Sequence, residues 1–125
     1  MSGTRSFQGR TILVAEDDPL IAPLLLDILE RAGATVLGPF PSLQMAHAAL
    51  ASVRPDAALL DVNLIDGDVF PLAAHLQQSE VPYVFFSASS PSHVPSTLQP
   101  RAFLKKPASL KDIVTAIDGM LEQRS

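Results

Sequence analysis

The sequence predicts an α/β protein with a mostly parallel sheet built from repeated strand–helix units. One observation is that short, nearly continuous apolar runs alternate with segments whose apolar residues recur at helical spacing. A second is that four of the apolar runs end on reactive polar residues, namely Glu16-Asp17-Asp18, Asp61, Ser87 and Lys105-Lys106. Open α/β sheets bind their ligands just past the carboxyl ends of the strands. We therefore expect these side chains to form one site rather than scattered surface charge.

The first strand is expected at Thr11 to Ala15, and a helix should follow it. The dipeptide Asp18-Pro19 matches an N-cap residue followed by proline at the first helical position. The apolar residues between Leu20 and Leu29 recur at helical spacing, and Gly33 is a typical C-terminal stop. Because Pro23 deletes an early helical hydrogen bond, a kink or a late start near it stays open.

The middle of the chain repeats the alternation of strand and helix. Strands are expected at Thr35 to Leu37 and at Ala57 to Leu60, on either side of a helix capped by Ser42. The apolar face of that helix consists of Leu43, Ala46, Leu50 and Val53. Turn residues at Leu64 to Asp68 then lead into a third helix at Val69 to Gln78.

The last third of the chain has a weak helix signal between two strands. These strands are expected at Tyr83 to Phe86 and at Ala102 to Leu104. The segment between them carries three prolines from Pro91 to Pro100, so any helix there must be short and poorly formed. The last helix is expected at Ser109 to about Glu122, where apolar residues again recur at helical spacing.

Length and composition indicate a single soluble domain. The chain has 125 residues, of which 47% are hydrophobic and 18% are charged. We expect residues 1–9 to form a flexible N-terminal tail and residues 10–125 to form the domain, with no output domain after the last helix. No apolar run approaches the roughly 20 residues that span a bilayer, and residues 1–9 hold only one large apolar side chain. A cytoplasmic protein with neither a signal peptide nor a membrane partner is therefore expected.

The charge and the cysteine content exclude several classes of function. With 9 basic and 13 acidic residues the net charge is −4, so no basic field is present to hold nucleic acid or anionic lipid. Because the chain has no cysteine, it cannot form a disulfide framework, a thiol nucleophile or a zinc–thiolate site. His47, His75 and His93 lack metal-ligand spacing, and no glycine-rich phosphate loop is present.

The carboxylates that follow two different strands suit a hard divalent cation. Glu16, Asp17 and Asp61 offer the oxygen ligands that Mg²⁺ prefers, and Mg²⁺ usually keeps some of its waters. Asp17 is the stronger metal candidate, whereas Glu16 is expected to bind either directly or through water. The alternative is that the acidic triplet merely caps a helix, but Asp18 alone would satisfy that role.

Asp61 is the candidate nucleophile of the site. A carboxylate can take up a phosphoryl group as an acyl phosphate, and the protein then needs in-line positioning and charge neutralisation. Ser87 offers a hydroxyl to a phosphoryl oxygen, and one of two adjacent lysines, Lys105 or Lys106, offers an ammonium group. Strand alternation sends those two lysine side chains to opposite faces without choosing between them. As ordinary alternatives, Asp61 or Ser87 could simply open a turn after its strand.

Taken together, three blocks of sequence resemble the receiver domain of two-component response regulators. They are Ile12-Leu13-Val14-Ala15-Glu16-Asp17-Asp18, Leu60-Asp61-Val62-Asn63-Leu64 and Phe103-Leu104-Lys105-Lys106-Pro107. Their order and spacing are highly specific together, and the likeness covers nearly the whole chain from Arg10 onward. The resemblance implies a flavodoxin-like, doubly wound sheet of five parallel strands in the order 2-1-3-4-5, here with a shortened or irregular fourth helix. It would place the strands that precede Asp17 and Asp61 side by side.

The same resemblance implies a role for each residue of the site. Asp61 would be phosphorylated by a histidine kinase or a histidine phosphotransfer protein, and the chain would signal to a further protein partner. Mg²⁺ would be the cofactor, held by Glu16, Asp17, Asp61 and the backbone carbonyl of Asn63. Lys106 rather than Lys105 would contact the phosphoryl group, and Ser87 would be the switch hydroxyl. Phe103 would be an aromatic switch, with core packing as its alternative role, and the protein would catalyse only its own phosphorylation and dephosphorylation.

A narrower likeness is to single-domain receivers of alphaproteobacteria. It rests on Gly33-Ala34-Thr35-Val36-Leu37-Gly38-Pro39, Asp61-Val62-Asn63-Leu64 and Val81-Pro82-Tyr83-Val84-Phe85-Phe86. Those proteins often carry Thr-Gly-Tyr after the fourth strand, where this chain has Ser87-Ala88-Ser89. Because that loop couples phosphorylation to the distant surface, a receiver-like interaction module that never uses phosphate is the alternative function. A phosphatase of the haloacid dehalogenase type is disfavoured, since Asn63 stands where that family has an acid–base aspartate.

Overall fold

The computed structural model describes residues 7–124, with side chains up to Leu121. Five strands form one parallel sheet in the spatial order β2-β1-β3-β6-β7. They are β1 (Thr11–Ala15), β2 (Thr35–Phe40), β3 (Ala57–Leu60), β6 (Tyr83–Ser87) and β7 (Ala102–Lys105). Since β6 and β7 are the fourth and fifth strands of this sheet along the chain, the expected 2-1-3-4-5 order is confirmed.

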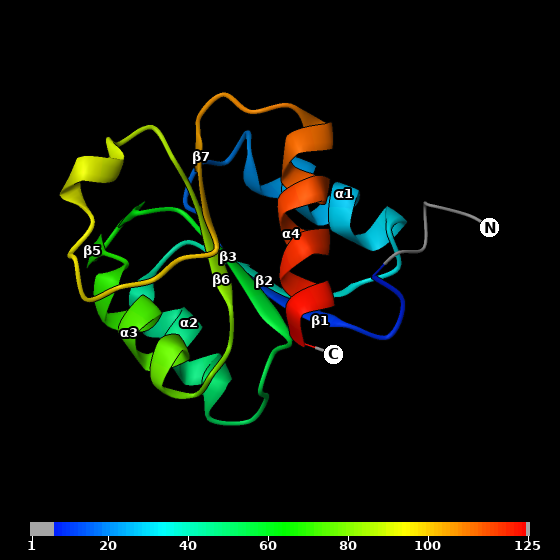
Figure 1. Cartoon of the computed structure of the whole chain (residues 1–125), viewed down its shortest axis with the longest axis horizontal. Helices are drawn as coiled ribbons and strands as arrows, with labels where there is room; N and C mark the ends of the chain where they lie inside the picture. The colour runs from blue at the N-terminus through cyan, green and yellow to red at the C-terminus, as the bar shows by residue number, and fades with distance from the viewer. Residues whose placement is uncertain (1–6, 125) are drawn as a thin grey trace.

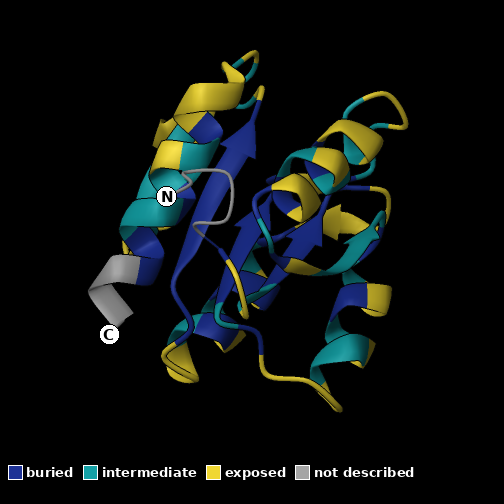
Figure 2. Ribbon diagram, turned by 90° about the vertical axis from the view of Figure 1, so that its right-hand side faces the viewer, coloured by how far each residue is buried: buried dark blue, intermediate teal, exposed yellow. Residues whose placement is uncertain are grey.

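Helices cover both faces of the sheet, as in a doubly wound fold (Figure 1). Helices α1 (Ala22–Arg31) and α4 (Leu110–Arg124) pack on one face. Helices α2 (Leu43–Leu50) and α3 (Phe70–Gln78) pack on the other. The central strands β1, β3 and β6 are therefore buried from both sides, as the dark blue arrows in Figure 2 show, which explains their near-continuous apolar sequences. No helix within the described residues has the length and apolar content needed to cross a membrane.

Helix α1 begins later than Asp18-Pro19, where the sequence predicts its N-cap. The first helical residue is Ala22, and Pro23 follows at a position whose N–H has no helical partner in any case. Asp18 instead forms a turn, in which its side chain accepts the Leu20 backbone N–H at 2.8 Å. The N-cap prediction for Asp18 is wrong, while the late start near Pro23 and the stop at Gly33, which has φ 99°, are confirmed.

Strand β2 continues past its expected end at Leu37 to Phe40. Its pairing with β1 is irregular around Gly38, which has φ 114°. A Cβ atom at Gly38 would lie 2.6 Å from the Val14 carbonyl oxygen, so only glycine fits there. The extension also holds the backbone of Glu16, the residue that follows β1, because the Phe40 carbonyl accepts the Glu16 N–H at 2.9 Å.

Two other predictions for the middle of the chain need adjustment. Helix α2 ends at Leu50, so Val53 lies beyond it and not on its apolar face. The segment expected to be a simple turn contains a hairpin, in which β4 (Asn63–Leu64) pairs antiparallel with β5 (Gly67–Asp68). The predicted Ser42 cap on α2 is confirmed.

The segment between β6 and β7 has one short helical turn, η2 (Pro91–His93), as its only helical structure within the described residues. The prediction of a shortened, irregular fourth helix is therefore confirmed. The segment still packs against the protein (yellow in Figure 1), because Leu98 is only 9% exposed and lies in the apolar cluster beneath α2 and α3.

The packed fold includes Phe7, which lies within the stretch 1–9 expected to be a flexible tail. Its side chain is fully buried in the apolar cluster beneath α1 and α4. Its backbone N–H also donates to the Ala32 carbonyl at 2.9 Å. Residues 1–6, the rest of the expected tail, lie outside the described residues.

Candidate functional site

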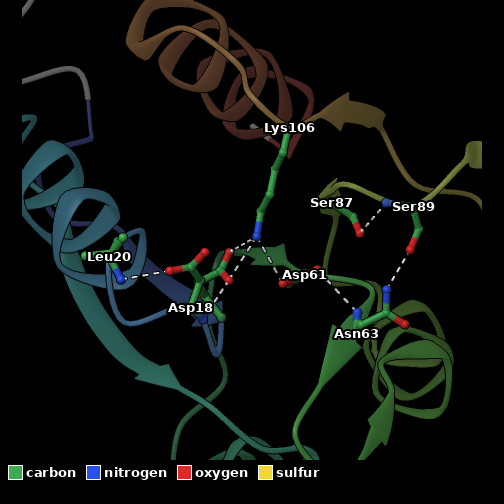
Figure 3. A network of polar contacts seen from close by, with 8 residues as sticks. Asp18, Leu20, Asp61, Asn63, Ser87, Ser89 and Lys106 are labelled. Atoms are coloured by element: carbon green, nitrogen blue, oxygen red, sulfur yellow. Dashed lines mark hydrogen bonds and ion pairs between the residues drawn. The ribbon is translucent and has the colours of Figure 1, made fainter.

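The sheet brings the polar residues that follow its strands to one edge. Strands β1 and β3 end side by side, so Glu16 and Asp61 come next on adjacent strands. Strands β6 and β7 also end together, at Ser87 and immediately before Lys106. Figure 3 shows the Lys106 side chain extending toward Asp61.

Three carboxylates meet at this edge. Glu16, Asp17 and Asp61 each offer an oxygen within 4.8 Å of the oxygens of the other two. Glu16 is 2% exposed and Asp61 is 7% exposed, whereas Asp17 is partly open to solvent. No histidine belongs to this group. Such a cluster of oxygen ligands is the kind that binds Mg²⁺.

Lys106 places its ammonium group between two of the carboxylates. Its Nζ atom lies 3.0 Å from Glu16 Oε1 and from Glu16 Oε2, and 3.1 Å from Asp61 Oδ2. The Phe86 ring centroid lies 5.3 Å from the same atom, close enough for a cation–π contact. Lys105, by contrast, is exposed. The geometry thus brings Lys106, and not Lys105, to the acidic group.

Burial and hydrogen bonding shift the pKa values of Glu16 and Lys106. Loss of hydration raises the pKa of Glu16 to about 7, and the hydrogen bonds from Lys106 and from the Asp18 N–H only partly offset this effect. Loss of hydration would by itself lower the pKa of Lys106. The bonds to Glu16 and Asp61 outweigh it and leave that pKa above its ordinary value, so Lys106 stays charged.

The donor set fits a divalent cation. Glu16 Oε1 is buried and, although Lys106 Nζ is nearby, it accepts no well-oriented hydrogen bond within the described residues. A buried carboxylate oxygen with an unused lone pair is costly unless a cation or a water satisfies it. Together with oxygens from Asp17 and Asp61, it supplies the hard ligands that Mg²⁺ requires. The Asn63 carbonyl stays a predicted ligand.

Ser87 belongs to a hydrogen-bond chain that the sequence did not reveal. Its fully buried hydroxyl accepts the Ser89 N–H at 3.2 Å, and the Ser89 hydroxyl accepts the Asn63 side-chain amide at 2.6 Å (Figure 3). The Asn63 backbone N–H in turn donates to Asp61 Oδ1 at 3.2 Å. The spacing of the two serines is typical of a side chain that bonds the backbone two residues on, which was the available signal.

Phe103 packs on the side of the sheet that carries α2 and α3. Its ring meets the Phe85 ring edge-on, with centroids 6.0 Å apart, and it is only partly buried. Core packing is therefore observed for Phe103, while its role as a switch stays a prediction.

The chain matches one protein family over most of its length. Residues 12–118, which include all four polar strand ends, match the family model of the response regulator receiver domain. The chain belongs to this receiver domain family. The expected family and its flavodoxin-like fold are thereby confirmed.

Individual relatives agree with this assignment. The transcriptional regulatory protein PdtaR of Mycobacterium tuberculosis is 27% identical over 113 residues, covering 87% of this chain and 55% of that protein. The transcriptional regulatory protein GltR of Pseudomonas aeruginosa is 30% identical over 125 residues, covering 94% and 51%. The chain thus spans about half the length of these relatives. Among solved structures, the signal receiver domain of a modulated diguanylate cyclase from Desulfovibrio desulfuricans G20 has a TM-score of 0.82 at 28% identity, covering 92% of this chain and 95% of that one.

Proposed function

We propose that this receiver is a phosphoacceptor switch in which Asp61 takes a phosphoryl group from a histidine kinase or a histidine phosphotransfer protein. The observation that carries the proposal is the Lys106 ammonium group, held between Glu16 and Asp61 within the three-carboxylate cluster. Phosphoryl transfer depends mainly on positioning and on neutralising charge, and this arrangement supplies both beside a nucleophile. Membership of the receiver family supports the same function.

The transfer step needs one oxygen of Asp61 and one cation on the chain. The Asp61 carboxylate oxygen forms a bond to phosphorus as the P–N bond of a donor phosphohistidine breaks, and the departing imidazole keeps the electron pair of that bond. Lys106 Nζ, 3.1 Å from Asp61 Oδ2, neutralises charge on the transferred oxygens. Glu16, Asp17, Asp61 and the Asn63 carbonyl would hold Mg²⁺, which would supply further neutralisation when bound.

Ser87 and Phe103 are the proposed switch residues. The Ser87 hydroxyl now accepts the Ser89 N–H, so a turn of that hydroxyl toward a phosphoryl oxygen would break this bond and change the loop that begins there. Phe103 is held on one side by Phe85 and is otherwise partly open, so its ring can respond to that movement. The change would be transmitted to a protein partner.

Labelling with acetyl phosphate tests the proposal directly. The intact mass of the chain would be measured after incubation with and without Mg²⁺, and Asp61→Asn would serve as the matched control. We expect a gain of about 80 Da that requires Mg²⁺ and is absent from the control. Asp61→Asn keeps nearly the same volume, so loss of labelling would report the missing nucleophile.

Failure to label would be separated from rapid hydrolysis by titration with beryllofluoride, which mimics a bound phosphoryl group. Labelling, or tight beryllofluoride binding without stable labelling, agrees with the proposal. The absence of both labelling and beryllofluoride binding would overturn the proposal. That result would favour the phosphate-independent interaction module, for which the departure at Ser87-Ala88-Ser89 is the supporting feature.

A further inference from the structure

The tip of the hairpin after β3 holds the first turn of α2. Asp66 lies at this tip and accepts two backbone N–H groups, from Leu43 at 2.7 Å and from Gln44 at 3.1 Å. The Ile65 N–H adds a third bond, to the Pro41 carbonyl at 3.2 Å. Ile65 and Asp66 of the hairpin are therefore hydrogen-bonded to the start of a helix that lies more than 20 residues earlier in the chain.

Asp66 accepts helix N–H groups that the Ser42 cap leaves unpaired. Ser42 already occupies the N-cap of α2 and accepts the Met45 N–H at 3.1 Å. Asp66 is exposed, and at such a position water can serve the remaining N–H groups of a helix start. The Leu43 N–H lowers the pKa of Asp66, so the side chain is ionised and its bonds to α2 are charge-assisted.

The stem of the same hairpin is bonded to the phosphoacceptor. Asn63 opens the hairpin, donates its N–H to Asp61 Oδ1 at 3.2 Å, and pairs with Asp68 on the second strand. Each strand of the hairpin is only two residues long, so little chain separates this stem from the tip. On the other side, the carbonyl of Phe40, the residue before Pro41, accepts the Glu16 N–H at 2.9 Å. The start of α2 is thus connected to the Asp61 carboxylate through the hairpin and to the Glu16 backbone through the end of β2.

We propose that Asp66 is a positioning residue that couples occupancy of Asp61 to the first turn of α2. This inference rests on the proposed phosphoacceptor function. A phosphoryl group or its mimic adds contacts beside Asp61 and Asn63. These contacts reduce the motion of the hairpin, so the hydrogen bonds from its tip to α2 break less often. Coupling between two sites is reciprocal, so opening of the α2 turn weakens binding at Asp61 by the same factor by which occupancy lowers the equilibrium constant for that opening.

Amide exchange measured by nuclear magnetic resonance on the full chain tests the coupling. We expect the Leu43 and Gln44 amides to exchange at least about fivefold more slowly with Mg²⁺ and beryllofluoride than with Mg²⁺ alone. The Met45 amide, which bonds to Ser42, is the internal reference and should change less. A merely structural cap would hold Leu43 and Gln44 equally well in both states.

Asp66→Ala supplies the second readout, since α2 keeps its Ser42 cap in this variant. We expect the variant to bind beryllofluoride about fivefold more weakly, and Asp66→Asn, which keeps one acceptor oxygen, to lie between it and the unmodified protein. Asp27→Ala is the control, because it removes an exposed carboxylate that bonds the Arg31 side chain within α1, on the opposite face of the sheet from α2. Its affinity should stay within about twofold.

Beryllofluoride binding without slower exchange at Leu43 and Gln44 would overturn the coupling while leaving the proposed function intact. Equal affinity in Asp66→Ala and the unmodified protein would overturn it as well. If the unmodified chain neither labels with acetyl phosphate nor binds beryllofluoride, the proposed function fails, and the coupling falls with it.

Discussion

At the residue scale, Lys106 and Glu16 show how the fold converts ordinary side chains into a charged site. Lys106 follows an edge strand, yet its ammonium group reaches across to the ends of β1 and β3, where two carboxylates are almost fully buried. Removing carboxylates from water favours their neutral form, and a nearby ammonium group opposes this. The hydrogen bond from Lys106 therefore offsets part of the effect of burial on the pKa of Glu16.

Replacement of Lys106 should disable phosphoryl uptake. In Lys106→Ala the cation nearest Asp61 is lost, and we expect the rate of labelling by acetyl phosphate to fall by about 100-fold, as when one preorganised transition-state donor is removed. Time courses of intact mass would measure this rate. Lys105→Ala removes the same charge from the neighbouring exposed residue and should stay within about twofold. Equal losses in both variants would show that Lys106 acts only through the general field of the protein.

Glu16 should make the metal-free protein less stable as the pH rises from about 4.5 to about 7. Its ordinary pKa is 4.5 and its pKa in the fold is about 7, so within this window the folded chain keeps a proton that the unfolded chain has released. The stabilisation from protonated Glu16 is complete below the unfolded value and is lost as the pH rises through the folded value. Thermal melts at several pH values without Mg²⁺ would measure it.

Glu16→Gln isolates this contribution, because the amide resembles the protonated acid at every pH. We expect the melting temperature of the unmodified protein, relative to this variant, to decrease steadily from pH 4.5 to 7. Glu30→Gln, at an exposed position on α1, is the control for the general effect of removing one carboxyl group. A flat difference for Glu16→Gln would mean that the folded chain ionises Glu16 normally.

At the element scale, the segment between β6 and β7 replaces a helix with a packed loop. Three prolines leave only the short turn η2, and Leu98 of the loop packs in the apolar cluster beneath α2 and α3. The Gln77 side chain also bonds the loop, donating to the Thr97 carbonyl at 2.9 Å and accepting the Gln99 N–H at 2.7 Å. The loop is thus held by both apolar and polar contacts.

Leu98→Ala tests whether this loop contributes to the stability of the fold. Because the Leu98 side chain is only 9% exposed, we expect a loss of about 2–3 kcal/mol in the free energy of unfolding, measured by urea titration. Leu110→Ala, at a side chain that is 56% exposed, should cost less than about 0.5 kcal/mol. Similar small costs for both would indicate that the loop opens without disturbing the core.

At the scale of the whole molecule, a cation bound by Glu16, Asp17 and Asp61 should stabilise the entire domain. The three carboxylates come from two different strands, so a cation that binds all of them binds the folded chain and not the unfolded one. Mg²⁺ at about 100 times its Kd should raise the free energy of unfolding by about 2.7 kcal/mol. Urea titrations with and without Mg²⁺ would measure the increase.

Asp17→Asn should remove most of this Mg²⁺ effect because it deletes one ligand of the group. Asp18→Asn is the matched control, since the neighbouring Asp18 lies outside the three-carboxylate group and should leave the Mg²⁺ effect nearly unchanged. Loss of the effect in both variants would point to general acidity of the edge rather than to a defined site.

The class of fold and the grouping of the three carboxylates can be predicted from the amino-acid sequence. Strands buried on both faces must be apolar throughout, so they are visible as continuous runs, and parallel strands align their carboxyl ends at one edge. The positions of Glu16, Asp17 and Asp61 directly after such runs therefore predict that the three side chains lie together. The spatial order of the strands came from the family resemblance, because periodicity alone does not specify which strands are neighbours.

Contacts that depend on side-chain direction or on residues distant in the sequence become visible in the folded chain alone. From the residues alone, Lys105 and Lys106 were equivalent, and the path of the chain past β7 is what directs the Lys106 side chain into the site. Asp18 forms a turn instead of the helix cap that its residue type favours. Phe7 is buried in the core, although the short polar segment around it does not predict this. The grip of Asp66 on α2 joins residues more than 20 positions apart, and no local pattern encodes such a pairing because it exists only after the sheet has brought the two segments together.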